Sequence, residues 1–123
     1  MKILVTGAAG FIGYHTSKLL LDEEYEVTGI DNLNDYYDPS LKKDRLKCLK
    51  QYKNFQFLKL DLIDEPALNK LFERNNFEVV VHLAAQAGIR YSLVNPRQYL
   101  ESNIIGSFNI LELSKKYKIS HLV

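Results

Sequence analysis

The sequence predicts an α/β fold in which helices cover both faces of a parallel sheet, and three observations support this fold class. Short apolar segments, rich in β-branched residues, alternate along the chain with longer segments of helical pattern. The run Val79-Val80-Val81 is typical of a central parallel strand, which is buried on both faces. Glycines follow the first apolar segment, where a helix is due to begin. We expect a doubly wound parallel sheet of strand order 3-2-1-4-5, truncated at its fifth strand.

Each element has a local signal in the sequence. The strands are expected where apolar and β-branched residues concentrate, at residues 2–6, 25–30, 55–60, 78–83 and 119–123. The helices expected between them span residues 14–21, 42–50, 64–75 and 97–117. Asp64 is a favourable capping residue, and Pro66 suits a first helical turn. Asn95 and Pro96 predict the start of the last helix in the same way.

The second helix carries a basic run, and its leucines set the expected orientation. Leu41, Leu46 and Leu49 are expected to point inward. The basic residues between positions 42 and 50 then form a solvated face. The run is short and lacks interleaved aromatic residues, so a nucleic-acid partner is not expected.

Three glycines mark the turn after the first strand as a phosphate-binding site. Gly7, Gly10 and Gly13 are spaced GxxGxxG, which differs from the commoner GxGxxG by one position at the first glycine. Glycines permit a tight turn and a close approach of the backbone to a ligand. The free N–H groups and the positive dipole end of the following helix attract an anion. A tight turn without a ligand would show the same glycines.

Asp31 turns this phosphate site into a candidate dinucleotide site. The carboxylate ends the second strand, eighteen positions after Gly13 (31 minus 13). A carboxylate at this place accepts hydrogen bonds from the adenosine ribose and repels a 2′-phosphate, which favours NAD over NADP as cofactor. The alternative is that Asp31 only opens the polar turn at residues 31–34.

Composition limits the remaining possibilities. With 123 residues, the chain is expected to form one incomplete NAD-binding domain over residues 1–123, without a substrate domain. A net charge of +1 and 25% charged residues exclude the usual signatures of disorder and of nucleic-acid binding. No apolar run is long enough for a membrane span, and Met1-Lys2 leaves no room for a signal peptide. The single cysteine, Cys48, agrees with a cytoplasmic location.

Four sequence blocks in order carry a family resemblance. They are TGAAGFIG after the first strand, DNLNDYYD after the second, LDL after the third and HLAAQAGIRYS after the fourth. With these blocks the chain resembles the extended short-chain dehydrogenase/reductase family, and within it the NAD-dependent sugar-nucleotide epimerases. The second and fourth blocks are most similar to those of the UDP-glucuronate 4-epimerases. The resemblance covers the whole chain, while proteins of this family are much longer.

The resemblance implies roles for residues at the ends of the strands. The expected NAD-binding residues are Gly7, Gly10, Phe11, Ile12, Gly13, Asp31, Asn32, Asn34, Asp61, Leu62, Leu83, Ala84, Ala85 and Asn103. Asp61 and Leu62 are expected beside the adenine, and Asn103 is expected to face the cofactor cleft. Gln86, Arg90 and Ser92 are expected to face the sugar, although Arg90 equally suits a structural ion pair. Many relatives have a lysine near the cofactor phosphates where this chain has Ala87.

The resemblance also implies a reaction for which this chain lacks the catalytic groups. The family uses a tyrosine and a lysine four positions later to remove a sugar hydroxyl proton as hydride passes to NAD. The one pair with this spacing, Tyr14 and Lys18, lies beside the phosphate turn and is interpreted as coincidence. We expect no catalytic residue and no metal site, and His82 is interpreted as structural.

Several functions remain open. The first is the NAD-binding part of an epimerase that acts on a UDP-sugar. The second is part of a sugar-nucleotide dehydratase or decarboxylase, and the third is a non-catalytic dinucleotide sensor. The helix at residues 97–117 is apolar on more than one face, and the resemblance implies a homodimer formed through it.

Overall fold

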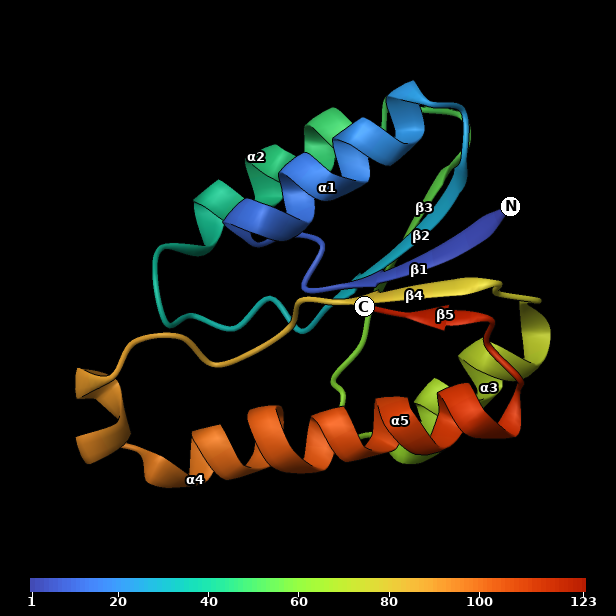
Figure 1. Ribbon diagram of the computed structural model, residues 1–123. Coiled ribbons are helices and arrows are strands. Elements are labelled where there is room, and N and C mark those ends of the chain that lie inside the picture. Colours follow the sequence, from blue (N-terminus) through green and yellow to red (C-terminus); the bar gives the residue numbers. More distant parts are fainter.

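The computed structural model describes residues 1–123, and its strands form one parallel sheet (Figure 1). The strands are β1 (Lys2–Thr6), β2 (Glu26–Asp31), β3 (Phe55–Lys59), β4 (Val79–His82) and β5 (His121–Leu122). Their order is β3-β2-β1-β4-β5, which confirms the predicted topology. In the register of the sheet, Leu4 of β1 lies between Thr28 of β2 and Val80 of β4.

Helices cover both faces of the sheet. Figure 1 shows α1 (Phe11–Asp22) and α2 (Pro39–Leu49) on one face, and α3 (Glu65–Arg74), α4 (Pro96–Tyr99) and α5 (Gly106–Lys116) on the other. The alternation of side chains along β1 assigns its residues to two cores. Ile3 and Val5 pack in the cluster that contains Leu21 of α1 and Leu49 of α2. Leu4 packs in the other cluster, among residues of α3 and α5.

The predicted helix starts at the two proline-containing sites differ in their capping. The Asp64 side chain accepts a hydrogen bond from the Ala67 amide at 3.2 Å, so this residue caps α3 as expected. Pro96 begins α4, but the Asn95 side chain makes no capping hydrogen bond. It donates instead to the Tyr91 hydroxyl at 3.4 Å, because the preceding turn brings that hydroxyl within reach.

The last helix is not regular over its predicted length. A π-helical segment at Leu100–Ile105 separates α4 from α5. A π-helical turn changes which side chains face a given direction, since it holds more residues per turn than an α-helix. The fifth strand is also shorter than the predicted 119–123 and pairs only with β4, through Val79–His121 and Val80–Leu122.

The orientation predicted for the second helix was wrong at its first turn. Leu41 is 50% exposed, whereas Lys42 is 7% exposed and points inward with Leu46 and Leu49. Lys42 precedes these leucines by four and seven residues, so all three lie on one helical face. The lysine tolerates this burial because Asp31 lies within salt-bridge distance. No helix of the structure has the length and apolarity that a membrane span requires.

Candidate functional site

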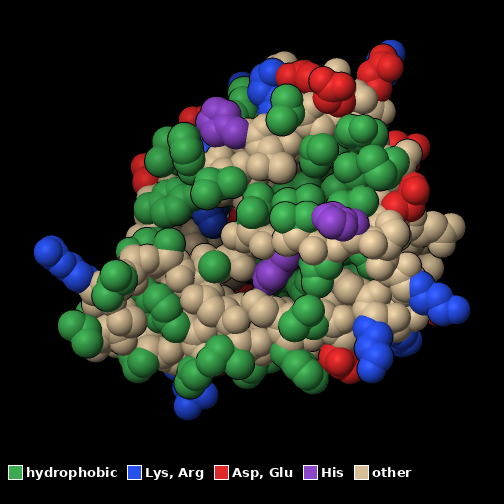
Figure 2. Space-filling view, in the orientation of Figure 1, with side chains coloured by type: hydrophobic (Ala, Val, Ile, Leu, Met, Phe, Trp, Pro, Cys, Tyr) green, Lys and Arg blue, Asp and Glu red, His purple; other side chains and the backbone are tan.

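A cavity of about 570 Å³ lies beyond the carboxyl ends of the strands. This is the edge at which open parallel sheets bind ligands. Figure 2 shows the hollow between the part of the molecule that carries α1 and α2 and the part that carries α4. All the predicted cofactor residues except Asn103 line it. These residues are Gly7, Gly10, Phe11, Ile12, Gly13, Asp31, Asn32, Asn34, Asp61, Leu62, Leu83, Ala84 and Ala85.

The glycine turn has a geometry that other residues would not permit. Gly7 has φ +69°, and a Cβ at this position would lie 2.9 Å from the Ala84 Cα on the neighbouring strand end. A Cβ on Gly13 would overlap the Gly7 carbonyl oxygen. Gly10 caps α1 without a side chain, so the amides of the first helical turn have no acceptor within the helix. The turn therefore presents free N–H groups to the cavity, as an anion site requires.

Two charged side chains brace this turn through one residue. The Ala9 amide donates to the Asp31 carboxylate at 3.2 Å, and the Ala9 carbonyl accepts from Arg45 Nη1 at 3.0 Å. Arg45 also donates to the Tyr37 hydroxyl at 3.1 Å. The shape of the glycine turn thus depends on β2 and α2 as well as on its own glycines.

Asp31 is buried at the edge of the cavity. The residue is 7% exposed. Its carboxylate pairs with Lys42, whose Nζ lies 3.1 Å from Oδ1. The same Oδ1 accepts from the Leu33 amide at 2.8 Å. Asp31 therefore accepts a hydrogen bond within the polar turn and also lines the cavity, so the two sequence interpretations of this residue do not exclude each other.

The neighbouring edge of the cavity is polar and organised by amide side chains. Asn32 donates to the Asp61 carboxylate at 3.3 Å, and the Asn34 amide donates to Asn32 Oδ1 at 3.1 Å. Leu62 is buried at 6% exposure and contributes an apolar wall. This combination of a carboxylate and an apolar side chain suits the edge and face of a purine ring.

A hydrogen-bond network joins β1 to the end of β4. Thr6 Oγ1 accepts from the amides of Leu83 and Ala84 at 3.1 and 3.0 Å. Since both lone pairs are then used, the Thr6 hydroxyl donates to His82 Nδ1 at 2.7 Å. His82 Nε2 carries the proton and donates to the Ser107 hydroxyl at 3.0 Å. Burial lowers the pKa of His82, which favours the neutral form of the ring in this network.

The segment after β4 follows the prediction only in part. Gln86 is buried and lines the cavity, whereas Arg90 and Ser92 lie in a one-turn 3-10 helix, Arg90–Leu93, outside the lining. Asn103 also lies outside it. Its side chain accepts from the Gln86 amide at 2.7 Å and donates to the Gln86 carbonyl at 3.2 Å. Asn103, which was expected to face the cofactor cleft, therefore bonds to the backbone of the loop after β4.

Several lining residues were not predicted from the sequence to belong to the site. They are Ile30, Tyr36, Tyr37, Leu41, Lys42, Arg45, Leu60, Ala87 and Ser102. The helical spacing of Lys42 to Leu46 and Leu49 indicates that it lies on the inward face of the helix, but its charge favours a solvent-exposed position. Ser102 lies in the π-helical segment, which sequence periodicity does not indicate.

Neither member of the Tyr14/Lys18 pair lines the cavity. Lys18 Nζ lies 2.7 Å from Asp22 Oδ2 on the surface of α1. Hydrogen bonding to Asp22 raises the pKa of Lys18. No group of three or more His, Cys, Asp or Glu side chains is placed to hold a metal ion.

Comparison with known proteins agrees with this geometry. Residues 4–122 match the family described as GDP-mannose 4,6 dehydratase. The chain is 52% identical to Protein CapI of Staphylococcus aureus over 123 residues, which are 100% of this chain and 36% of that protein. It is 49% identical to the UDP-glucuronate 4-epimerase of Thermodesulfobacterium geofontis over 120 residues, which are 98% of this chain and 37% of that protein.

A solved structure shows the same arrangement. The UDP-glucuronic acid 4-epimerase from Bacillus cereus, in complex with UDP-glucuronic acid and NAD, superposes with a TM-score of 0.84 at 39% identity. The match covers 94% of this chain and 36% of that one, so the chain spans about a third of the length of these relatives. The chain belongs to the extended short-chain dehydrogenase/reductase family of NAD-dependent sugar-nucleotide epimerases and dehydratases, and it corresponds to their amino-terminal portion.

Proposed function

We propose that this chain binds NAD in the cavity at the carboxyl edge of the sheet. One observation carries the proposal: the glycine turn, Asp31 and the Asp61–Leu62 wall line a single cavity. The free amides at the start of α1 suit the pyrophosphate, and Asp31 suits the adenosine ribose. Asp61 and Leu62 suit the adenine. The domain is then residues 1–123, and bound NAD would supply a hydride acceptor for a sugar hydroxyl carbon.

We propose further that the chain is the cofactor-binding part of a UDP-glucuronate 4-epimerase. The relatives near 50% identity that bear this name support the choice of reaction and of a UDP-sugar substrate. The matching family description names a dehydratase, which keeps that reaction as the second candidate. Within this chain, Tyr14 and Lys18 lie outside the cavity, so the 123-residue chain is proposed to bind the cofactor without turning over a UDP-sugar.

The sugar-facing role of the loop after β4 stays a proposal for the longer protein. Gln86 lines the cavity and is placed to contact a ligand. Arg90 is exposed, and its guanidinium is free to meet a carboxylate or phosphate brought by another part of that protein. Ser92 donates within its own turn, to the Ile89 carbonyl.

A second copy of the chain is the proposed partner of the helix at residues 97–117. Leu100, Ile104, Phe108 and Leu111 are each more than half exposed. Figure 2 shows hydrophobic side chains along the lower edge of the molecule, where α4 and α5 lie. Sedimentation velocity at micromolar concentration is expected to show a dimer that Phe108→Lys converts to monomer.

Calorimetric titration of the chain tests the cofactor proposal. We expect saturable binding of NAD, competition by ADP-ribose, and competition by nicotinamide mononucleotide at least tenfold weaker, about 1.4 kcal/mol, because the polar contacts lie at the adenosine and pyrophosphate positions. Wild-type chain is expected to bind NAD more tightly than NADP. A folded chain that binds none of these ligands at millimolar concentration would contradict the proposal.

A further inference from the structure

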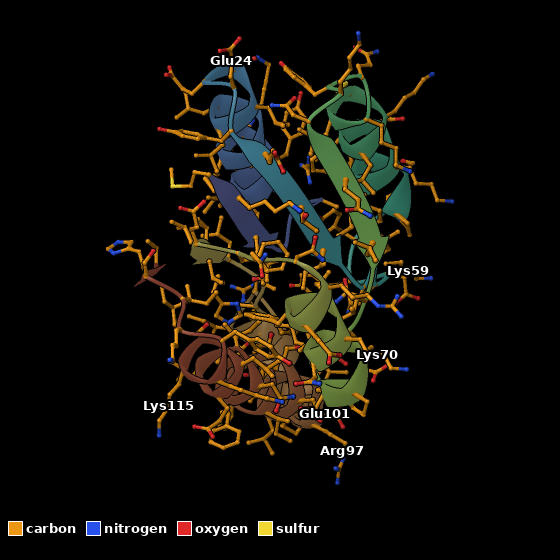
Figure 3. All side chains as sticks on the ribbon, turned by 90° about the vertical axis from the view of Figure 1, so that its right-hand side faces the viewer. Glu24, Lys59, Lys70, Arg97, Glu101 and Lys115 are labelled. Carbon is orange, nitrogen blue, oxygen red and sulfur yellow. The ribbon has the colours of Figure 1, made fainter.

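Lys42 is the one lysine of the chain that is buried, and it is buried at the cavity. Its Nζ lies 3.1 Å from Asp31 Oδ1 and 5.4 Å from the centre of the Tyr37 ring. The other lysines are exposed or, in the case of Lys2, half-buried, and Lys59, Lys70 and Lys115 point into solvent in Figure 3. A lysine withdrawn from water needs a partner, and Asp31 with the Tyr37 ring provides one.

Stability alone gives little reason for a lysine at this position. Buried ion pairs contribute little net stability, and apolar replacements are often neutral or stabilising. Leu46 and Leu49 follow on the same face of α2, so an apolar residue in place of Lys42 would continue their stripe. The lysine sits at the end of this stripe, where the face reaches the cavity.

The hydrogen bonds of Asp31 leave it too few free positions for a ribose diol. An ionised carboxylate accepts at about four lone-pair positions. Oδ1 accepts from the Leu33 amide and from Lys42, and Oδ2 accepts from the Ala9 amide at 3.2 Å. One position on Oδ2 remains, whereas the adenosine ribose presents two neighbouring hydroxyls. The second hydroxyl needs another partner at this edge.

Lys42 supplies that partner. An ammonium group has three donors, and one of them is directed at Asp31. One hydroxyl can donate to Asp31 Oδ2 while its neighbour accepts from Lys42 Nζ, so the ion pair matches the diol with one acceptor and one donor. The cation–π contact with Tyr37 and the burial of the side chain fix the ammonium group in place beforehand.

Arg45 adds a second cation to the same edge. It lies one helical turn after Lys42, lines the cavity, and is held by the Ala9 carbonyl and the Tyr37 hydroxyl. The edge thus carries the charges of Lys42 and Arg45 against the single charge of Asp31. A 2′-phosphate would meet one repulsive and two attractive groups.

We propose that Lys42 is a specificity-determining residue of this site, which binds the adenosine ribose together with Asp31. With Arg45 it makes the choice between NAD and NADP a balance of two cations against one carboxylate. The inference rests on the proposed function, because it concerns the same cofactor. Asp31 then has two effects: it holds the diol, and it cancels a phosphate site that the cations would otherwise form.

A double-mutant cycle with two ligands tests this proposal. NAD and NADP are titrated calorimetrically into the wild-type chain, Lys42→Met, Asp31→Asn and the double variant. Lys43→Met is the matched control, because this substitution removes the same charge from the exposed neighbouring residue. Lys42→Met is expected to weaken NAD binding about tenfold, the value of one charge-assisted hydrogen bond. Lys43→Met is expected to leave it unchanged within twofold.

The NADP arm separates a binding role from a structural one. Asp31→Asn is expected to raise the ratio of NADP to NAD affinity at least about tenfold, and the double variant is expected to lose most of this gain. Lys42→Gln keeps a donor without the charge. Its affinity for NAD is expected to lie within about threefold of wild type. Combined with Asp31→Asn, it is expected to give no increase in the ratio of NADP to NAD affinity. This variant replaces Lys42→Met in the experiment if circular dichroism shows that Lys42→Met does not fold.

Two failures are distinguishable. Absence of NAD binding by folded wild-type chain would overturn the proposed function, and this inference with it. Either of two results would overturn this inference alone. The first is an equal affinity for NAD in the wild-type chain and in folded Lys42→Met. The second is that Asp31→Asn raises the ratio of NADP to NAD affinity equally with and without Lys42.

Discussion

On the β1–β2 side of the cavity the backbone is enclosed and braced, whereas on the β4 side the chain lies open. Ala8 and Ala9 of the glycine turn are 0% exposed, and the Ala9 amide and carbonyl are each held by a charged side chain. After β4, Ile89 is 90% and Leu93 is 88% exposed. The open segment is held by side-chain contacts to its backbone, such as those of Tyr99 and Asn103.

This difference indicates how well each side of the cavity tolerates amino-acid substitutions. The enclosed side is determined by backbone geometry, where one added carbon meets atoms that cannot move away. The open side is determined by a few side chains, whose ends can swing into solvent. The same substitution should therefore have unequal effects on the two sides.

A pair of glycine substitutions gives the largest expected contrast. Gly13→Ala places a Cβ against the Gly7 carbonyl oxygen, so the buried turn must distort. We expect a loss of about 3 kcal/mol or more in the free energy of unfolding, and a loss of cofactor binding. Gly88→Ala meets only the Tyr36 hydroxyl, at the end of a side chain that is 42% exposed. Its remaining cost is strain at φ +89°, about 1–2 kcal/mol. Urea unfolding that shows equal losses would remove the contrast.

The hydroxyl that joins the two sides should have the next largest effect. Thr6→Val removes the acceptor for the Leu83 and Ala84 amides and the partner of His82. We expect about 2 kcal/mol of destabilisation by urea unfolding, because two partly buried N–H donors lose their acceptor. Thr28→Val is the matched control: this threonine is 3% exposed on the neighbouring strand. A cost for Thr28→Val that equals the cost for Thr6→Val would show that the network contributes nothing specific.

The smallest expected effect is a pH dependence that originates at His82. Burial lowers its pKa from the usual 6.5, so below that pH the unfolded chain takes up a proton that the folded chain does not. The free energy of unfolding should then decrease as the pH falls from 7.5 to 5.5. His82→Gln should flatten this decrease, while His121→Gln, at an exposed position, should preserve it. Asp22 and Asp38, whose pKa values lie below 3.8, titrate outside this window. An unchanged slope in His82→Gln would refute the assignment.

Local sequence signals predicted the enclosed side well. The glycine turn and the position of Asp31 follow from interactions within one βαβ unit, and the strand order follows from the succession of such units along the chain. The capping role of Asp64 is equally local. Arg90, Ser92 and Asn103 do not line the cavity, and the sequence did not indicate this, because the path of the segment after β4 depends on contacts with residues farther along the chain.

The sequence by itself determined the parallel sheet, the glycine turn and the carboxylate beside it, because short-range sterics and apolar patterning leave few alternatives there. Only the tertiary structure decided that Lys42 is buried and Leu41 is not. A charged side chain is buried only where an oppositely charged partner lies nearby, and the partner of Lys42, Asp31, belongs to another element. The tertiary structure also decided that Thr6 meets His82, 76 positions away. Hydrogen bonds between such distant residues form when the sheet brings strand ends together, and no local pattern in the sequence encodes that meeting.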